Sequence, residues 1–163
     1  LEKYDMRQEH KEGYTVPMKF TEDATPQNGG TANSIDVTFS KGSSGKNTYF
    51  EYNATDKLYY VSQYGAAYKD DGNGKQVAVT NVLVLFAPTT QIAGDDKGRL
   101  DVTLTGSGEG YFACGGKYVS LTWSKADAAS PFVYTLEDGS ELVFGAGKSY
   151  INIVPVGNDV VFA

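Results

Sequence analysis

The sequence has 163 residues, which suits one domain with room for a sizeable core. A formal net charge of -6 and a pI near 4.7 argue against nucleic acid as the main partner, because phosphate backbones require a basic stripe. The sequence contains no polybasic cluster for an anionic membrane surface and no apolar run as long as a membrane span. Its single cysteine excludes an internal disulfide and leaves the compartment open.

The residue content favours an all-β fold. Twelve tyrosines and eight phenylalanines suit half-buried strands, and nineteen glycines supply turns. We predict an antiparallel sandwich or open barrel of about eleven short strands.

The N-terminal residues differ in character from the rest of the chain. Residues 1–12 are charged and free of proline, and Gly13 follows them, so we predict one short helix there. We interpret residues 1–13 as this helix or as the tail of a missing upstream lobe, and residues 14–163 as a single β domain. Because the chain does not begin with Met, we expect it to be a processed or cloned fragment.

Strands are predicted where apolar and polar residues alternate between turn signals. Pro17 confines the first strand to a sheet edge. The longest apolar run, Val77 to Ala87, is placed centrally, and its interrupting Asn81 is expected to tie a neighbouring loop to the sheet. The other main strands are expected at Thr15–Phe20, Ser34–Ser40, Asn47–Tyr52, Lys57–Tyr64, Ser149–Pro155 and Val160–Phe162.

Two hairpins are predicted around glycine turns. Adjacent Gly115 and Gly116 can take the positive φ angles of a primed turn, which sets Cys114 opposite Lys117. Strand alternation then places the aliphatic and aromatic residues on one core face and the more polar ones on the other. The core-face residues are Phe112, Cys114, Val119, Leu121 and Trp123. The second hairpin, Val133 to Phe144, turns at Asp138-Gly139, a strong two-residue turn signal.

Most motifs with catalytic potential have a structural explanation. The run from Gly106 to Gly110 is interpreted as a turn, since a phosphate-binding loop requires a following helix. Cys114 is expected to be a buried small hydrophobe rather than a nucleophile paired with His10, the only histidine. The sequence indicates no cofactor and no metal site.

Adjacent acidic pairs occur in four predicted turns or loops and are interpreted as solvated turn residues. The alternatives, a hard-cation site and a glycosidase pair, remain open because the sequence shows neither ligand spacing nor carboxyl separation. The pairs are Glu22-Asp23, Asp70-Asp71, Asp95-Asp96 and Glu137-Asp138.

Tyrosines from Tyr59 to Tyr68 are the best indication of recognition. Aromatic faces with polar tips suit the binding of sugars or peptides. The alternative is that Tyr60 and the residues on the same strand face fill the core, while the remaining tyrosines shield a sheet edge. Our candidate binding residues are Tyr64, Tyr68, Asp70 and Lys125.

Two motifs carry a family resemblance. GSGEGYFACGGKYVSLTWSK and PFVYTLEDGSELVFGAGKSYINIVP resemble the C-terminal domain of the YerB-like bacterial lipoproteins, a family of unknown function. The resemblance extends upstream through TNVLVLF and more faintly to VPMKF and IDVTFS. The positions of the family's frequent arginine and histidine correspond here to Val61 and Tyr68, whereas Asp70 is kept.

The resemblance implies an extracytoplasmic location, on the outer face of a bacterial cytoplasmic membrane, with a lipid anchor outside this sequence. We therefore expect a non-catalytic envelope domain that binds a cell-wall component or an envelope protein, besides contacting the upstream lobe. The alternatives are an envelope hydrolase that uses a carboxylate pair and a purely structural lobe.

Overall fold

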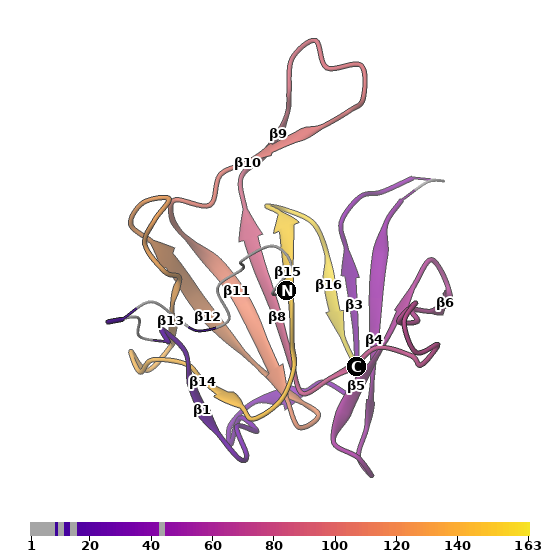
Figure 1. Cartoon of the computed structure of the whole chain (residues 1–163), viewed down its shortest axis with the longest axis vertical. Helices are drawn as coiled ribbons and strands as arrows, with labels where there is room; N and C mark the ends of the chain where they lie inside the picture. Colours follow the sequence, from indigo (N-terminus) through magenta and orange to yellow (C-terminus); the bar gives the residue numbers. More distant parts are fainter. Residues whose placement is uncertain (1–8, 10–11, 14–15, 43–44) are drawn as a thin grey trace.

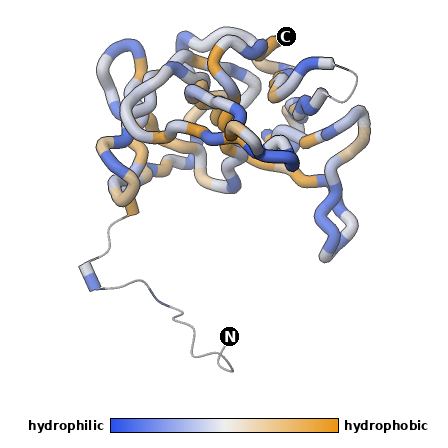
Figure 2. Tube along the Cα trace, turned by 90° about the horizontal axis from the view of Figure 1, so that it is seen from above, coloured by the Kyte–Doolittle hydropathy of each residue, from blue (hydrophilic) through white to orange (hydrophobic). Residues whose placement is uncertain are grey.

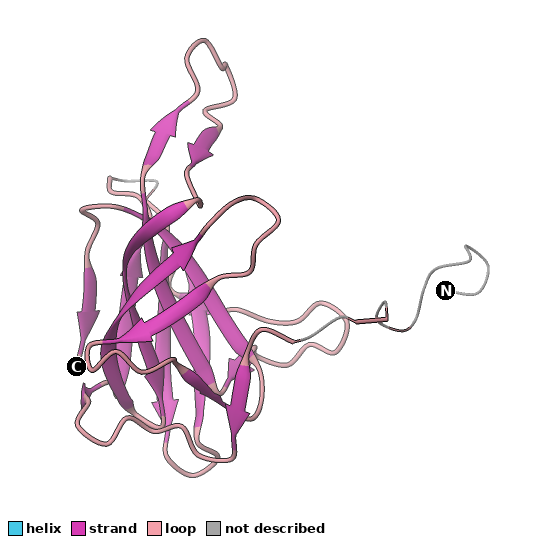
Figure 3. Ribbon diagram, turned by 90° about the vertical axis from the view of Figure 1, so that its left-hand side faces the viewer, coloured by secondary structure: helices cyan, strands magenta, loops and turns pink. Residues whose placement is uncertain are grey.

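The structure, a computed structural model, describes residues 9, 12–13, 16–42 and 45–163. Every regular element in this part of the chain is a strand (Figure 3). The strands are β1 (Lys19–Thr21), β2 (Gly30–Thr31), β3 (Ser34–Thr38), β4 (Asn47–Asn53), β5 (Leu58–Gln63), β6 (Ala66–Ala67), β7 (Ala78–Val79), β8 (Asn81–Ala87), β9 (Thr89–Gln91), β10 (Leu100–Val102), β11 (Gly106–Cys114), β12 (Lys117–Lys125), β13 (Val133–Leu136), β14 (Val143–Gly145), β15 (Ser149–Pro155) and β16 (Val160–Phe162).

The predicted all-β class is confirmed, but the strands are more numerous than the eleven expected, because several segments split into short pieces that pair with different partners. The helix expected over residues 1–12 falls, apart from residues 9 and 12, outside the described residues. Across the described ranges, no helix has the length and apolar character that crossing a membrane demands.

Two six-stranded sheets make up the body and lie side by side in the view of Figure 1. Sheet I has the order β13-β12-β11-β8-β15, with β2 also paired to β12, and sheet II has the order β16-β3-β4-β5-β6, with β7 also paired to β5. Both sheets contribute to the buried cluster between them, the inner core: Ala32, Ile35, Val37, Phe50, Tyr59, Val61, Val79, Val82, Val84, Ala113 and Val154. Hydropathy colouring places apolar residues inside this body and hydrophilic residues on its peripheral loops (Figure 2).

The sheets are open and not purely antiparallel. β15 runs parallel to β8, and β1 runs parallel to β14 in a separate two-stranded sheet. Long stretches of chain separate β1 from β14 and β8 from β15, and they permit the parallel pairing that a tight turn cannot reach. A further pair, β9 and β10, projects from the body (Figures 1 and 3).

The run from Val77 to Ala87 is divided at Thr80 instead of forming one strand. β7 pairs with β5 in sheet II, whereas β8 lies between β11 and β15 in sheet I. The central position predicted for this run is confirmed for β8, in which every residue except Phe86 is buried. One apolar run therefore contributes to both sheets.

The face of sheet I that points away from sheet II carries a second buried cluster, the outer core. Trp123 is 1% exposed there, and its indole N–H donates to the Phe86 carbonyl oxygen at 3.0 Å. The outer core consists of Leu83, Leu85, Ala87, Phe112, Cys114, Leu121, Trp123, Tyr134, Leu142 and Phe144. The core face predicted for the first hairpin is thus confirmed, but its other face is also buried in places, as Ala113 shows.

The first hairpin has the predicted turn and register. Gly115 and Gly116 have φ angles of 61° and 77°, and Cys114 is paired with Lys117. The run from Gly106 to Gly110, expected as a turn, is instead the first half of β11. A Cβ atom on Gly110 would lie 2.4 Å from the carbonyl oxygen of Val84, so glycine here permits close approach of β8.

The second hairpin turns at Asp138-Gly139, but its loop has three residues rather than two. The Leu136 N–H donates to the Ser140 carbonyl oxygen at 2.8 Å, and the Gly139 N–H donates to the Leu136 carbonyl oxygen at 2.9 Å. Gly139 has a φ of 82°, whereas Asp138 keeps a negative φ. This is a type I turn followed by a left-handed glycine, which gives a longer connection than a primed turn.

Asn81 holds the end of β14 against sheet I, which confirms its predicted role. Its side-chain amide donates to the Gly145 carbonyl oxygen at 2.9 Å, and the Gly145 N–H donates back to its oxygen at 2.8 Å. Asn81 is fully buried, so these bonds satisfy a polar group that would otherwise destabilise the fold. They also fix the strand that follows the second hairpin.

Candidate functional site

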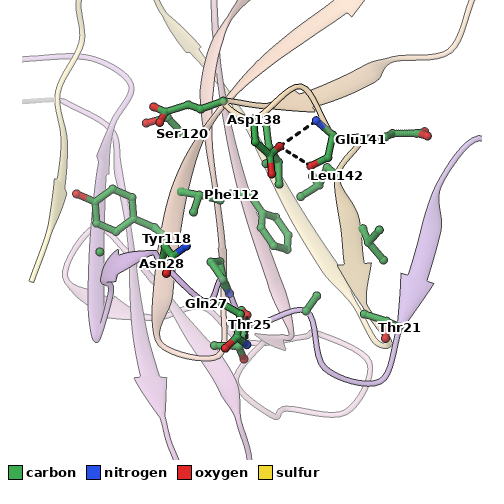
Figure 4. Close-up of a pocket in the computed structure, with 18 of the residues that line it drawn as sticks. Thr21, Thr25, Gln27, Asn28, Phe112, Tyr118, Ser120, Asp138, Glu141 and Leu142 are labelled. Carbon is green, nitrogen blue, oxygen red and sulfur yellow. Dashed lines mark hydrogen bonds between the residues drawn. The ribbon is translucent and has the colours of Figure 1, made fainter.

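A groove of about 840 Å³ opens on the outer face of sheet I (Figure 4). One wall is the loop over residues 21–30, between β1 and β2, and the other is the hairpin over residues 136–143. The floor is apolar, because Phe112, Val119 and Leu142 line it and Phe112 is only 1% exposed. The volume lies in the range of small-ligand sites.

The groove lies where β12 changes its edge partner. β12 pairs with β2 at Lys117 and Tyr118, and with β13 from Leu121 to Ser124. Val119 and Ser120 fall between these two partners, and both line the groove. The opening therefore follows from an interrupted sheet edge.

The loop wall is held by local hydrogen bonds and by contact with the first hairpin. Asp23 accepts a hydrogen bond from the Thr25 backbone N–H at 2.9 Å. Thr25 packs over Gly115 so closely that a Cβ atom on that glycine would lie 1.9 Å from its hydroxyl oxygen. The Lys117 ammonium donates to the Gln27 carbonyl oxygen at 3.4 Å. These contacts keep the loop against the β11–β12 turn.

The hairpin wall is held by a side-chain cap and an ion pair. One Asp138 carboxylate oxygen accepts hydrogen bonds from the Ser140 N–H at 2.9 Å and the Ser140 hydroxyl at 2.6 Å (dashed in Figure 4). Lys19 on β1 forms an ion pair with Glu141 across the two short strands. Both side chains of the ion pair are substantially exposed, so the pair orients the rim more than it stabilises the fold.

The rim of the groove is acidic. Four carboxylates line it, Asp23, Glu137, Asp138 and Glu141, and no lysine, arginine or histidine lines it among the described residues. Hydrogen bonds from Thr25 hold the pKa of Asp23 below its usual value, and hydrogen bonds from Ser140 do the same for Asp138. These two carboxylates are therefore ionised at neutral pH, which suits attraction of cations rather than proton donation.

The four candidate residues named from the sequence lie outside this groove. Tyr64 and Tyr68 are 68% and 43% exposed in the segment after β5. Asp70 accepts the backbone N–H groups of the turn that follows it, at 2.8 and 3.2 Å. Lys125, at the end of β12 in the other sheet, donates to three backbone carbonyl oxygens of the next loop. Their role in binding stays a prediction.

In the tyrosine-rich strand β5, Tyr59 and not Tyr60 points into the core. The alternative considered from the sequence, in which Tyr60 fills the core, is therefore wrong. Tyr59 and Val61 are fully buried, whereas Tyr60 is only half-buried and donates its hydroxyl to Asp56 at 2.5 Å. Tyr59 accepts the Gly116 N–H at 3.1 Å, so its phenol group braces the turn of the first hairpin. Packing in the inner core decides this parity, because alternating tyrosines suit either face.

Cys114 is a buried hydrophobe, as predicted. It is 4% exposed, and burial raises the pKa of its thiol. His10 lies outside the described residues. Over the described ranges, no three His, Cys, Asp or Glu side chains are grouped so as to hold a metal ion.

Sequence reasoning did not find the groove, because its two walls are separated by more than a hundred residues. Two of the four acidic pairs were nevertheless a partial signal. Asp23 and the Glu137-Asp138 pair both line the groove, whereas the Asp70 and Asp95 pairs lie elsewhere. Convergence of two acidic turns on one apolar floor depends on topology, which the sequence pattern does not carry.

The fold and the groove define an all-β domain of several open sheets with an acidic surface groove. Residues 35–151 match the family described as "Protein of unknown function (DUF3048) C-terminal domain", and the chain belongs to this family, which confirms the resemblance inferred from the sequence.

Two comparisons with individual proteins agree with this assignment. The chain is 32% identical over 155 residues to "Putative lipoprotein YerB" of Bacillus subtilis (strain 168), covering 93% of this chain and 43% of that protein. It also resembles the crystal structure of the YerB protein from Bacillus subtilis, with a TM-score of 0.71 and 24% identity, over 89% of this chain and 47% of that one. The chain thus spans less than half the length of the relative it matches.

Proposed function

We propose that this chain is a non-catalytic, extracytoplasmic domain of a lipid-anchored bacterial envelope protein and that it binds a cell-wall component or an envelope protein. The name of the Bacillus subtilis relative, "Putative lipoprotein YerB", supports the location. In this proposal the anchor belongs to the full-length protein, and the upstream lobe of the same protein lies beside this domain.

The observation that carries the binding role is the groove. It combines a volume of about 840 Å³, an apolar floor and a polar rim, which are the usual properties of a ligand site. Its walls are braced by contacts such as the Asp23 and Asp138 caps, so the site is formed before a ligand arrives. A preformed site loses less conformational entropy when it binds.

The main alternative is a hydrolase that uses the rim carboxylates. Such chemistry requires one carboxyl with a raised pKa as general acid and one ionised partner. Asp23 and Asp138 have the opposite shift, because hydrogen-bond donors stabilise their charged forms. This favours binding. A turnover assay on cell-wall fragments that shows hydrolysis abolished by Glu137→Gln would overturn the non-catalytic proposal.

Site-specific photocrosslinking tests the binding role. A photoreactive amino acid replaces Gln27, which lines the groove, in the full-length protein in living cells. The control replaces Glu51, an exposed residue on β4 of sheet II. We expect light-dependent adducts with wall material or a protein from position 27 and none from position 51. Equal adduct formation at both positions, or none at either, would count against a groove ligand.

A further inference from the structure

Building on the proposed function, we propose that the groove binds a segment of a partner protein that carries lysine or arginine side chains. Charge complementarity is the first argument. The lining holds four carboxylates and no basic side chain, and the chain as a whole has a net charge of -6. Lys19 is paired with Glu141, and Lys117 and Lys57 lie near the loop wall that carries Asp23. The unpaired negative charge for a cationic ligand therefore lies mainly at Glu137 and Asp138.

A further carboxylate lies around the sheet edge from the groove. A smaller hollow of about 240 Å³ borders the same edge of β12 and contains this carboxylate, Glu109. Ser120 and Glu137 line both hollows, and Glu109 shares the face of β11 that carries Tyr111, which packs against the inner core, so the second hollow opens on the other side of this sheet edge. Carboxylates on both sides of this edge fit a polypeptide with more than one basic side chain better than a single small cation.

The floor suits the aliphatic part of such a segment. Lysine and arginine place their methylene groups on apolar surface while the charged end reaches water or a carboxylate. The half-buried Val119 offers most of this apolar surface beneath the acidic rim, because Leu142 is only 4% exposed. Both charge and hydrophobic contact are therefore available to the same side chain.

The aromatic side chains of the lining favour a polypeptide over a saccharide. Sugar-binding sites use exposed aromatic faces as platforms. Phe112 is 1% exposed, and the Tyr118 ring is stacked on Phe162 with 3.7 Å between centroids and 5° between planes. Of the two aromatic lining residues, one is thus buried and the other already uses one ring face for Phe162, which leaves a saccharide little aromatic surface.

Fluorescence anisotropy on the full-length protein in detergent tests the ligand class. One labelled peptide alternates lysine with valine over about nine residues, and its counterpart carries glutamate in place of lysine. We expect the lysine peptide to bind about tenfold more tightly and to weaken as NaCl rises from about 50 to about 500 mM. Equal binding of the two peptides, no binding of either, or displacement of the lysine peptide by soluble wall fragments would overturn the proposal.

Paired variants locate the effect in the groove. Glu137→Gln with Glu141→Gln should weaken lysine-peptide binding by about threefold or more, since two rim charges are lost. Glu51→Gln removes a charge from the exposed face of sheet II and should leave binding unchanged. Unchanged binding of the double variant would place the peptide elsewhere.

If position 27 still crosslinks in cells while the lysine peptide fails to bind, only the ligand class is wrong. If both experiments fail, the proposed function is wrong too.

Discussion

The two faces of sheet I are both apolar, yet they are covered differently. The inner face packs against the whole of sheet II, and its side chains join a continuous interior. Among the described residues, the outer face is covered by short segments: the β1–β14 pair, the loop over residues 21–30, the hairpin over residues 136–143, and the loops that carry Leu104 and Phe132. Where these short segments fail to meet over β12, the groove remains. A candidate binding site arises here from incomplete cover of a core rather than from a separate structural unit.

The largest expected effect tests whether both faces are true cores. Phe50→Ala in the inner core and Trp123→Ala in the outer core should each lower the free energy of unfolding by about 3–5 kcal/mol. Val161 is 60% exposed, and Val161→Ala should change it by about 0.5 kcal/mol or less. Denaturant unfolding monitored by circular dichroism measures all three. A cost below about 1 kcal/mol for Trp123→Ala would show that the outer face is not a core.

A smaller effect is expected where the outer cover is fastened. Asn81→Ala removes both hydrogen bonds to Gly145 and should cost about 1–3 kcal/mol, because the buried backbone groups lose their partner. In hydrogen exchange, amides of β14 should lose protection, whereas those of β4 in sheet II should not. Equal loss of protection in both strands would mean that Asn81 supports the whole fold instead of one cover segment.

The smallest effect concerns the hairpin wall and depends on pH. The pKa of Asp138 lies below its ordinary value of 3.8, because Ser140 donates to the carboxylate, so the charged form stabilises the folded state. This contribution of Asp138 to folding stability is fully present above the pKa that the group has in the unfolded chain. It is lost as the pH falls through the lower pKa that the group has in the folded protein. The Asp138→Ala variant should therefore have a lower melting temperature than wild type at pH 6, measured by thermal unfolding. The difference in melting temperature should vanish at pH values below the pKa of Asp138 in the folded protein. Ser140→Ala should reproduce part of the effect; a difference that persists in acid would contradict this account.

Local signals predicted the hairpins well where several of them agreed. At Gly115-Gly116, the turn residues and the alternating pattern required the same register, and the structure has it. The bounds of β15 and β16 also match the prediction, because turn residues enclose each run. At Asp138-Gly139, the dipeptide alone did not distinguish a two-residue loop from a three-residue loop.

Predictions were less accurate where more than one neighbour could accept the same segment. The break at Thr80 was invisible, since an apolar run is equally suited to one buried strand or to two strands in different sheets. The parity of Tyr59 and Tyr60 was likewise undetermined, because tyrosine is compatible with a core face and with a solvent face. The candidate residues Tyr64, Tyr68 and Asp70 were chosen from this same ambiguous strand and its turn.

By itself, the sequence determined the all-β class, the family, the first hairpin with its register and the buried state of Cys114. These features depend on residues close together along the chain or on patterns that repeat within one strand. Only the tertiary structure decided that sheet I has two cores, that β7 and β8 part at Thr80, and that Asp23 and Glu137 border one groove. Those features depend on which distant segments pair and how completely they cover one another, and that balance of packing is a property of the assembled chain.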